Sequence, residues 1–417
     1  MSDSATDVII IGGGPSGCSA GALLAQSGRR VLILEREKFP RYHVGESMIP
    51  FTNLPIQRLG LREKMEQSAY VQKHSVQFVA PNGATSQPFY FSTRYEDDVA
   101  QTWQVLRSEF DHMLMDHARD RGAVVQEETK VTKLLEENGQ IVGVETQSKG
   151  GELTEIRAPI TLDCTGKESF AANKLRWRQK DPFLNKVAVW TYFKGAKRDP
   201  GIDEGATTVA FIPEKGWFWY IPLHDDRVSV GVVAEGKYLT RDGERDLERI
   251  FMREVENNAW IKEYTSQGER DAAFRITNEY SYHSQHCYKN GLLLVGDAFA
   301  FLDPVFSSGL MLALKSGVMA ADAVENAFRT HNFSPDQFAD YGAQLREGIE
   351  NMRKLVYAFY APDFSFAKLT KAYPEIAPLV TDCLSGDVNK DFSEMFEKVA
   401  KFAEIPQVLP LGRPDYN

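Results

Sequence analysis

The chain has few cysteines, no excess of basic residues and no long hydrophobic segment. Its four cysteines among 417 residues are widely spaced, at Cys18, Cys164, Cys287 and Cys383, and form neither a disulfide framework nor a zinc-binding pattern. The formal net charge is −10, whereas a nucleic-acid-binding face needs a basic surface. No stretch reaches the ~18 consecutive apolar residues of a membrane span. We therefore expect no nucleic-acid partner and no membrane span.

What is present is typical of a globular protein of roughly two to three domains. Hydrophobic residues make up 43% and charged residues 25% of the chain, an ordinary balance that argues against disorder. The N-terminus begins with polar and acidic residues and lacks the basic start and long apolar stretch of a signal peptide. Reduced thiols are the simplest interpretation of the cysteines, so we expect a cytoplasmic protein.

The N-terminal segment has the pattern of a nucleotide-binding strand, loop and helix. Residues 7–11 form a short β-branched apolar run, which predicts a buried strand, and residues 12–17 contain four glycines. The Ala- and Leu-rich stretch 18–26 predicts a helix, and 31–34 predicts a second strand. This order is that of a dinucleotide-binding βαβ unit.

Gly12, Gly14 and Gly17 make a GxGxxG fingerprint in which each glycine has its own task. The first allows a tight turn, the second lets a pyrophosphate approach the backbone, and the third lets the helix pack closely on the strand. Glu35 ends the second strand, where an acid can hold ribose hydroxyls. An acid there favours NAD or FAD over NADP. A glycine-rich structural turn is the alternative interpretation.

Three later segments resemble FAD-binding flavoproteins of the p-hydroxybenzoate hydroxylase and glutathione reductase type. The apolar run 291–295 leads into Gly296-Asp297, which resembles the segment that brings an Asp to the ribityl chain of FAD. Residues 163–166 resemble the family's Asp-x-Ser/Thr-Gly motif, and Arg107 stands where the family has an arginine near the flavin. The resemblance implies FAD. We find no second GxGxxG within a strand–helix–strand context for NAD(P)H.

Hydrophobic patterning predicts the remaining elements. Residues 124–164 alternate apolar and polar side chains and predict a β-meander, and 184–235 are again strand-rich. Residues 308–328 and 335–360 predict helices.

The resemblance implies an α/β fold: a Rossmann-like FAD-binding domain with an inserted β-sheet substrate domain and a helical C-terminal region. The expected FAD-binding domain is discontinuous, and the substrate-side sheet is inserted between its pieces. We expect 1–67, 104–183 and 286–350 in the FAD-binding domain, 68–103 and 184–285 in the substrate-side sheet, and 351–417 in the helical C-terminal segment.

Three further motifs are similar to those of the flavin-dependent halogenases. Residues 217–222 match the family's WxWxIP motif in full, and 301–309 match its FxxPxxSxG segment. The segments 39–47 and 70–78 resemble the region of the active site, with Lys73 at the position of the family's active-site lysine. Together the resemblance covers most of the chain.

The resemblance also implies roles for these residues. Trp217 and Trp219 would wall the substrate away from the flavin, and Lys73 would carry or orient hypohalous acid, with its pKa lowered by burial. A halide would bind at a helix N-terminus, whose N–H groups and dipole attract anions; its residues are Ser307, Ser308 and Gly309. The cofactor-binding residues are Gly12, Gly14, Pro15, Ser16, Gly17, Glu35, Arg36, Ser47, Arg107, Gly296, Asp297 and Gly309.

Each motif also has a purely structural interpretation. An aromatic stripe is most often a core strand, a serine before a helix is often a cap, and a lysine usually lies on the solvated surface.

His283, His286 and Cys287 form HxxHC, but no further ligand pair has the spacing to complete a metal site. We expect none.

One position departs from the pattern of the tryptophan halogenases. They carry a Glu before the Ser-x-Gly, and Phe306 stands there instead. The chain looks more like the halogenases of phenolic or pyrrolic rings, which are often presented on a carrier protein.

The sequence therefore predicts an FADH2- and O2-dependent halogenase that places chloride or bromide on an electron-rich aromatic ring. A separate flavin reductase would supply the reduced FAD as a transient partner. Three alternatives stay open: a single-component FAD monooxygenase, an FAD-dependent reductase of isoprenoid-type double bonds, and a non-catalytic flavin-binding protein.

Overall fold

The structure, a computed structural model, describes residues 6–214, 216–277 and 281–409. Its first sheet has the strand order β20-β21-β11-β1-β2-β7, in which β21, β11, β1, β2 and β7 run parallel. The carboxyl ends of these strands therefore meet at one edge. The strands are β1 (Val8–Ile11), β2 (Val31–Leu34), β7 (Val124–Gln126), β11 (Ile160–Asp163), β20 (Tyr288–Lys289) and β21 (Leu292–Leu294).

Strand β1 is apolar at every position because both of its faces are covered. Val8 and Ile10 belong to the core that contains Leu23 of helix α1 (Pro15–Gln26), whereas Ile9 and Ile11 pack on the opposite side. That side is covered by the predicted meander, now seen as β8 (Thr129–Glu137), β9 (Gln140–Ser148) and β10 (Leu153–Arg157). The prediction over 124–164 holds for these three strands, while β7 and β11 join the parallel sheet instead.

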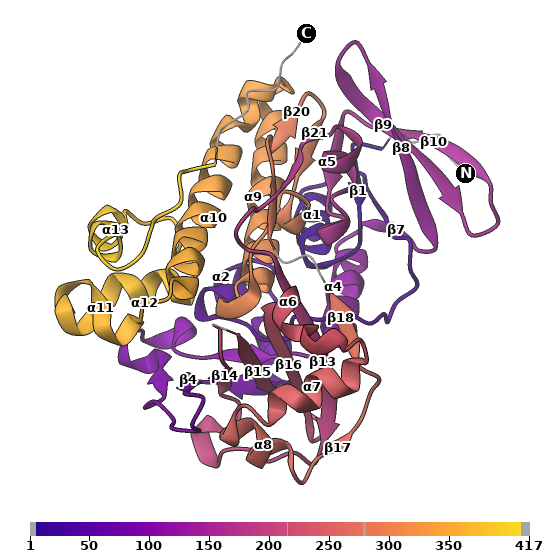
Figure 1. Ribbon diagram of the computed structural model, residues 1–417. Coiled ribbons are helices and arrows are strands. Elements are labelled where there is room, and N and C mark those ends of the chain that lie inside the picture. Colours follow the sequence, from indigo (N-terminus) through magenta and orange to yellow (C-terminus); the bar gives the residue numbers. More distant parts are fainter. Residues whose placement is uncertain (1–5, 215, 278–280, 410–417) are drawn as a thin grey trace.

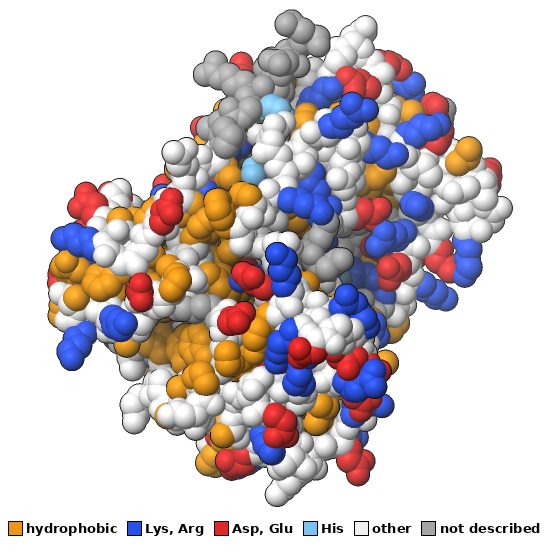
Figure 2. All heavy atoms as spheres, in the orientation of Figure 1, with side chains coloured by type: hydrophobic (Ala, Val, Ile, Leu, Met, Phe, Trp, Pro, Cys, Tyr) orange, Lys and Arg blue, Asp and Glu red, His pale blue; other side chains and the backbone are white. Residues whose placement is uncertain are grey.

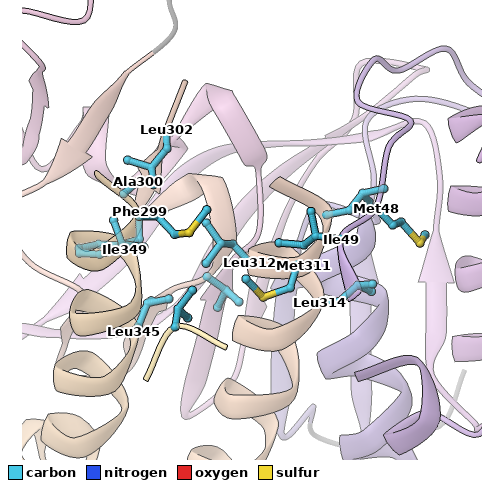
Figure 3. Packing of buried hydrophobic residues seen from close by; sticks show 14 of the residues in the cluster. Met48, Ile49, Phe299, Ala300, Leu302, Met311, Leu312, Leu314, Leu345 and Ile349 are labelled. Carbon is cyan, nitrogen blue, oxygen red and sulfur yellow. The ribbon is translucent and has the colours of Figure 1, made fainter. Parts of the chain in front are cut away.

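Long helices cover the other face of the first sheet (Figure 1). They are α4 (Arg107–Asp120), α9 (Gly309–Thr330) and α10 (Ala339–Tyr360). Helix α9 packs between α10, through Leu345 and Ile349, and the segment that carries Ile49 (Figure 3). The two predicted helices are confirmed, but the second begins at Ala339 because Pro335–Phe338 forms a 3-10 turn.

The second sheet is mostly antiparallel and lies below the first in Figure 1. Its order is β17-β13-β16-β15-β14-β4-β5, with β18 also paired to β13. Helices α7 (Leu247–Val255) and α8 (Ala259–Thr265) cover one face of this sheet. The opposite face is turned toward the first sheet and the C-terminal helices. The strands are β4 (Ser75–Val79), β5 (Phe89–Tyr90), β13 (Lys186–Lys194), β14 (Thr207–Phe211), β15 (Trp217–Pro222), β16 (Arg227–Glu235), β17 (Glu269–Arg270) and β18 (Arg275–Thr277).

The C-terminal helices α11 (Phe366–Ala372), α12 (Ala377–Ser385) and α13 (Ser393–Val399) lie beside α10. Asp382 of α12 connects them to the segment that follows β5 by accepting hydrogen bonds from Arg94 and Tyr95, and it also accepts one from Lys390 of the C-terminal region. Figure 2 shows hydrophobic side chains gathered on this side of the molecule. Within the described ranges, no helix is both long enough and apolar enough to cross a membrane.

Shorter elements complete the chain. They are β3 (Val71–Lys73), β6 (Thr102–Gln104), β12 (Arg178–Lys180), β19 (Tyr282–Ser284), β22 (Ala300–Phe301), α2 (Asn53–Arg58), α3 (Arg62–Glu66), α5 (Phe170–Lys174) and α6 (Gly236–Leu239).

Candidate functional site

A cavity of about 340 Å³ lies where the two sheets meet. The first sheet contributes Ile11 and Leu34, the last residues of β1 and β2, and the second sheet contributes Thr207, Val209 and residues of β15. Ligands of open parallel sheets bind outside the carboxyl ends of the strands. The cavity has this position and continues to the second sheet.

The glycine fingerprint forms the tight contact that its spacing predicts. Gly12 has φ +103°, and a Cβ atom there would lie 2.5 Å from the Cys164 carbonyl oxygen. A Cβ atom on Gly17 would lie 2.0 Å from the Gly12 oxygen, so α1 can approach the loop only with glycine at that position. Gly14 is different, because its Cβ would meet nothing closer than Arg41 Nη2 at 3.6 Å.

These residues divide into those that face the cavity and those that build its wall. Gly12, Gly14, Pro15 and Ser16 line the cavity, whereas Gly17 supports the loop from behind. Helix α1 begins at Pro15, so its first N–H groups, which have no partner within the helix, are at the cavity. This is the arrangement that binds a pyrophosphate.

Two acidic residues line the cavity close to the glycine loop. Glu35 lines it and accepts hydrogen bonds from the backbone N–H groups of Gly13 and Glu37, each at 2.8 Å. Asp297, which follows Gly296 and β21, also lines it. Burial raises the pKa of Asp297 to about 6, although Lys167 and Arg107 act in the opposite direction.

The two predicted arginines have different environments. Arg36 lines the cavity at its outer part and pairs with Glu168. Arg107 begins α4 and is buried, and its guanidinium donates to both carboxylate oxygens of Asp111, at 2.8 and 3.0 Å. Its remaining nitrogen donates to the Val44 carbonyl at 3.0 Å. Arg107 therefore lines the cavity and also holds the loop that precedes Ser47.

The predicted cofactor residues fit FAD. The glycine loop offers its backbone where a Cβ on Gly14 would project into free space, and an acid stands at the end of β2 for the ribose. The same cavity is also lined by Asp297, Ser47 and Gly309. Gly296 is buried and supports Asp297.

The predicted halide residues form the start of α9. Ser307 adopts a left-handed conformation with φ +55°, and Ser307 and Gly309 line the cavity. Ser308 is the N-cap residue and is buried, and its side chain is not among those that line the cavity. The first N–H groups of a helix lack intrahelical partners and attract anions, so the backbone here is the part that can hold a halide.

Strand β15 presents its tryptophans to the cavity because side chains alternate along a strand. Trp217, Trp219 and Ile221 line the cavity, and Phe218 and Tyr220 pack in the core below α7 and α8. The two tryptophan rings lie 6.3 Å apart between centroids. Trp219 Nε1 donates to Ser229 Oγ at 3.0 Å.

Trp217 is tied to the segment that precedes α9. Its Nε1 donates to the Tyr360 hydroxyl at 2.8 Å, and Tyr360 donates to Asp303 Oδ2 at 2.9 Å. Asp303 in turn accepts from the Val305 N–H at 3.1 Å. The sequence motifs include Trp217 and Asp303 but do not indicate Tyr360, because α10 brings it from another part of the chain.

Lys73 is fully buried rather than on the solvated surface. It ends strand β3 with 1% of its surface exposed, and its Nζ donates to Ser47 Oγ at 2.9 Å and to the Met48 carbonyl at 2.8 Å. Burial lowers its pKa to about 7. Ser47 lines the cavity, and Lys73 lies directly behind it.

Sequence reasoning missed a polar network beside Ser47. Glu46 lines the cavity and accepts a hydrogen bond of 2.5 Å from Tyr192, and the Tyr192 hydroxyl contacts that of Tyr42 at 3.2 Å. Burial raises the pKa of Glu46. Glu46 stands inside the recognised 39–47 motif, but no local signal indicates Tyr192, which comes from β13.

The HxxHC residues are separate from this site. His283 lies in β19, the His286 ring lies 4.8 Å from that of Trp177, and Cys287 is buried. Among the residues that the structure describes, no three His, Cys, Asp or Glu side chains gather so as to hold a metal ion.

The parallel sheet with its glycine loop, the second sheet and the cavity between them define an FAD-dependent oxidoreductase. The family model described as tryptophan halogenase matches residues 7–95 and 81–368. The chain therefore belongs to the flavin-dependent halogenases, which are enzymes. The predicted fold class, family and cofactor class are confirmed.

Relatives and solved structures agree with this family. The chain is 28% identical to the 1H-pyrrole-2-carbonyl-[peptidyl-carrier protein] chlorinase of Pseudomonas fluorescens, with 97% of this chain and 94% of the relative covered. It is 30% identical to the corresponding brominase of Pseudoalteromonas luteoviolacea, with 80% of each covered. The flavin-dependent brominase Bmp2 superposes with a TM-score of 0.85 at 26% identity, covering 96% of this chain and 97% of that one.

Proposed function

We propose that this enzyme uses reduced FAD and O2 to place chloride or bromide on a phenolic or pyrrolic ring, with Lys73 as the residue that delivers the halogen. The observation that carries the proposal is that one cavity is lined by the glycine loop, by Ser307 and Gly309 and by both tryptophans, with Lys73 one side chain beyond Ser47.

The substrate class follows from two observations. Phe306 takes the place of the acid found in tryptophan halogenases and packs against Phe359 and Phe366, with ring centroids 5.8 and 5.9 Å apart. The absence of an acid at this position suits a ring that is already electron-rich. The pyrrole relatives act, by their names, on a ring attached to a peptidyl carrier protein, and we propose a carrier-bound ring here as well.

Reduced FAD, delivered by a separate flavin reductase, supplies with O2 the oxidant that turns a halide ion into hypohalous acid. This chain's residues bind and separate the reactants. The glycine loop, Glu35 and Asp297 hold the dinucleotide, and the N–H groups at Ser307–Gly309 hold the halide. Trp217 and Trp219 keep the organic ring away from the flavin.

Lys73 is suited to take the halogen because its side chain is buried and its pKa is close to neutral pH. An amine with a pKa of about 7 is largely unprotonated at slightly alkaline pH. In the proposed step its nitrogen forms an N–halogen bond while the oxygen–halogen bond breaks and water leaves. The halogen then passes to a ring carbon, and the ring proton returns to the amine.

The four buried free thiols fit a reducing compartment, and we propose the cytoplasm.

The proposal is tested by mixing the holoenzyme with a flavin reductase, NADH, O2 and bromide, and detecting brominated phenols, free pyrroles and carrier-bound pyrroles by mass spectrometry. Lys73→Met keeps the length of the side chain without its N–H groups. We expect it to bind FAD and to lose bromination by more than about a hundredfold.

The matched control is Lys315→Met, on α9, whose Nζ contacts Asn389 rather than the cavity. It should brominate at nearly the wild-type rate. Full bromination by Lys73→Met with FAD bound would contradict the role of Lys73. Hydroxylated product formed with NAD(P)H and no reductase would instead indicate a monooxygenase.

A further inference from the structure

A pair of hydroxyl groups stands between the cavity and Lys73. Ser47 and Thr207 line the cavity, and their Oγ and Oγ1 atoms are 2.9 Å apart. On the far side, Ser47 Oγ accepts a hydrogen bond of 2.9 Å from Lys73 Nζ. Thr207 Oγ1 also accepts a hydrogen bond of 2.8 Å from Gln104 Nε2. Anything that travels from the cavity to Lys73 along this line meets these hydroxyls first.

Lys73, Ser47, Thr207 and Gln104 form a hydrogen-bonded string of side chains. The fold builds this string from segments that are far apart in the sequence. Strand β3, which ends in Lys73, pairs with β6, which ends in Gln104, and Gln104 forms a β-bridge with Ser47. Thr207 begins β14 of the second sheet, and Gln104 Nε2 also donates to the Gly205 carbonyl at 3.0 Å. All four side chains are buried. Buried hydroxyls held at both sides keep a defined orientation.

The hydrogen-bond count around Lys73 matches a neutral amine. Its two N–H groups have two acceptors, Ser47 Oγ and the Met48 carbonyl, and the lone pair is left for another partner. Among the described residues, no further oxygen accepts a hydrogen bond from Nζ, and the centroid of the Phe91 ring lies 5.7 Å from it. Gln104 Oε1 is buried and has no hydrogen-bond partner in the described structure, so the string can accept one more donor.

We propose that Ser47 is the proton relay of Lys73 and that Thr207 and Gln104 are its positioning residues; this rests on the proposed halogenase function. Hypohalous acid from the cavity binds along the string. The Lys73 nitrogen then forms a bond to the halogen as the oxygen–halogen bond breaks. The proton leaving Nζ goes to Ser47 Oγ, and Ser47 passes its own hydroxyl proton to the departing hydroxide, which leaves as water. Ser47 ends as it began, and no further oxidant is needed.

The test separates formation of hypohalous acid from its use. With the holoenzyme, reductase and bromide, released acid is measured by bromination of the soluble trap monochlorodimedone, and ring bromination by mass spectrometry. We expect Ser47→Ala to lose about a hundredfold in ring bromination per molecule of acid formed, a ratio that does not depend on any change in FAD binding. Ser47→Thr, which keeps a hydroxyl, should restore most of it. Thr207→Val should lose about tenfold.

Thr191→Val is the matched control. Thr191 is a buried threonine of the same sheet, and its hydroxyl donates to the Ala272 carbonyl, away from the cavity. It should behave like the wild type. Ring bromination at the wild-type rate in Ser47→Ala would overturn the relay and leave the halogenase function standing. If the wild type forms neither acid nor brominated ring, the proposed function itself fails.

A second readout needs no turnover. In protein labelled with ¹³C at the lysine ε-carbon, the Lys73 signal is assigned by its loss in Lys73→Met and titrated by NMR. Removing the Ser47 acceptor takes a hydrogen bond from the charged amine, so the pKa of Lys73 should fall in Ser47→Ala and return in Ser47→Thr. An unchanged titration in Ser47→Ala would overturn the contact on which the relay depends.

Discussion

At the scale of single residues, burial sets the charge of the groups around the cavity. Desolvation raises the pKa of Asp297 and of Asp303 to about 6, in the second case against a hydrogen bond from Tyr360. It lowers the pKa of Lys73 to about 7. Groups whose pKa lies near the working pH exchange protons readily. The cavity is therefore lined by, or backed by, side chains that can change their protonation near neutrality.

The pKa of Lys73 predicts a pH-dependent cost to the stability of the fold. A lysine is protonated up to about pH 10.4 in an unfolded chain but only to about pH 7 in this structure. Folding expels a proton between these values, so the cost is full below pH 7 and disappears as the pH rises toward the unfolded value. Lys73→Met removes it.

We expect Lys73→Met to raise the free energy of unfolding relative to the wild type at pH 7. The gain should shrink toward pH 10 by at most about 1.4 kcal/mol per pH unit, as measured by denaturant titration at pH 7 and pH 9.5. Lys262→Met, at an exposed lysine of α8, is the control for changing a lysine to methionine. A gain that is the same at both pH values would mean that Lys73 is not buried as a neutral amine.

At the scale of elements, the N-terminus of α1 combines two glycines with different physical tasks. Gly17 is needed for packing, since its Cβ would lie 2.0 Å from a backbone oxygen. A Cβ on Gly14 would have space in the protein alone, and we propose that the bound dinucleotide is what requires glycine there. These contacts agree with the tasks that the motif assigns to its second and third glycines.

Alanine substitutions should separate the two tasks. We expect Gly14→Ala to leave the stability of the protein without FAD within about 1 kcal/mol of the wild type and to weaken FAD binding at least about tenfold. Gly17→Ala should lose about 3 kcal/mol or more of stability from overpacking. Thermal unfolding of the FAD-free protein and quenching of FAD fluorescence measure the two effects. Equal FAD affinity in Gly14→Ala would place the pyrophosphate elsewhere.

The start of α9 shows how an element is tied to its surroundings. The Asp303–Tyr360–Trp217 hydrogen bonds connect the turn before α9, the end of α10 and strand β15. The tryptophan wall and the predicted halide turn are thus parts of one hydrogen-bonded unit. A substitution in either part should therefore shift the position of the other.

At the scale of the whole molecule, Asp382 joins the C-terminal helices to the segment that follows β5 of the second sheet. Burial raises its pKa, but hydrogen bonds from Arg94 and Lys390 dominate and hold the pKa at about 2. The carboxylate is 1% exposed, while Arg94 remains partly exposed. A buried carboxylate with several donors loses much more when neutralised than a surface ion pair does.

Asp382→Asn should lower the free energy of unfolding by about 1–3 kcal/mol. In the wild type this contribution is fully present above pH 4 and is lost as the pH falls toward about 2, because the folded-state pKa is the lower one. Asp322→Asn, whose pair with Arg58 is exposed, is the control and should change stability by less than about 0.5 kcal/mol. Equal losses of unfolding free energy in the two variants at neutral pH would contradict the role of Asp382 in holding the C-terminal helices in place.

The sequence by itself determined the βαβ unit, the glycine fingerprint, the helices α9 and α10 and the tryptophan strand. Each depends on neighbours within one element, where the period of side chains and the chemistry of turns act locally. The proposed cofactor residues from Gly12 to Asp297 follow from these motifs. What each glycine contacts does not.

Only the tertiary structure decided which polar groups meet and which are buried. Ser47 and Thr207 are 160 positions apart and share a hydrogen bond, and Tyr360 reaches Trp217 across 143 positions. The low pKa of Lys73 arises because β3, β6 and the Ser47 segment close around it. Desolvation depends on everything that surrounds a group, and this is why a lysine in a motif became a buried amine only once the chain had folded.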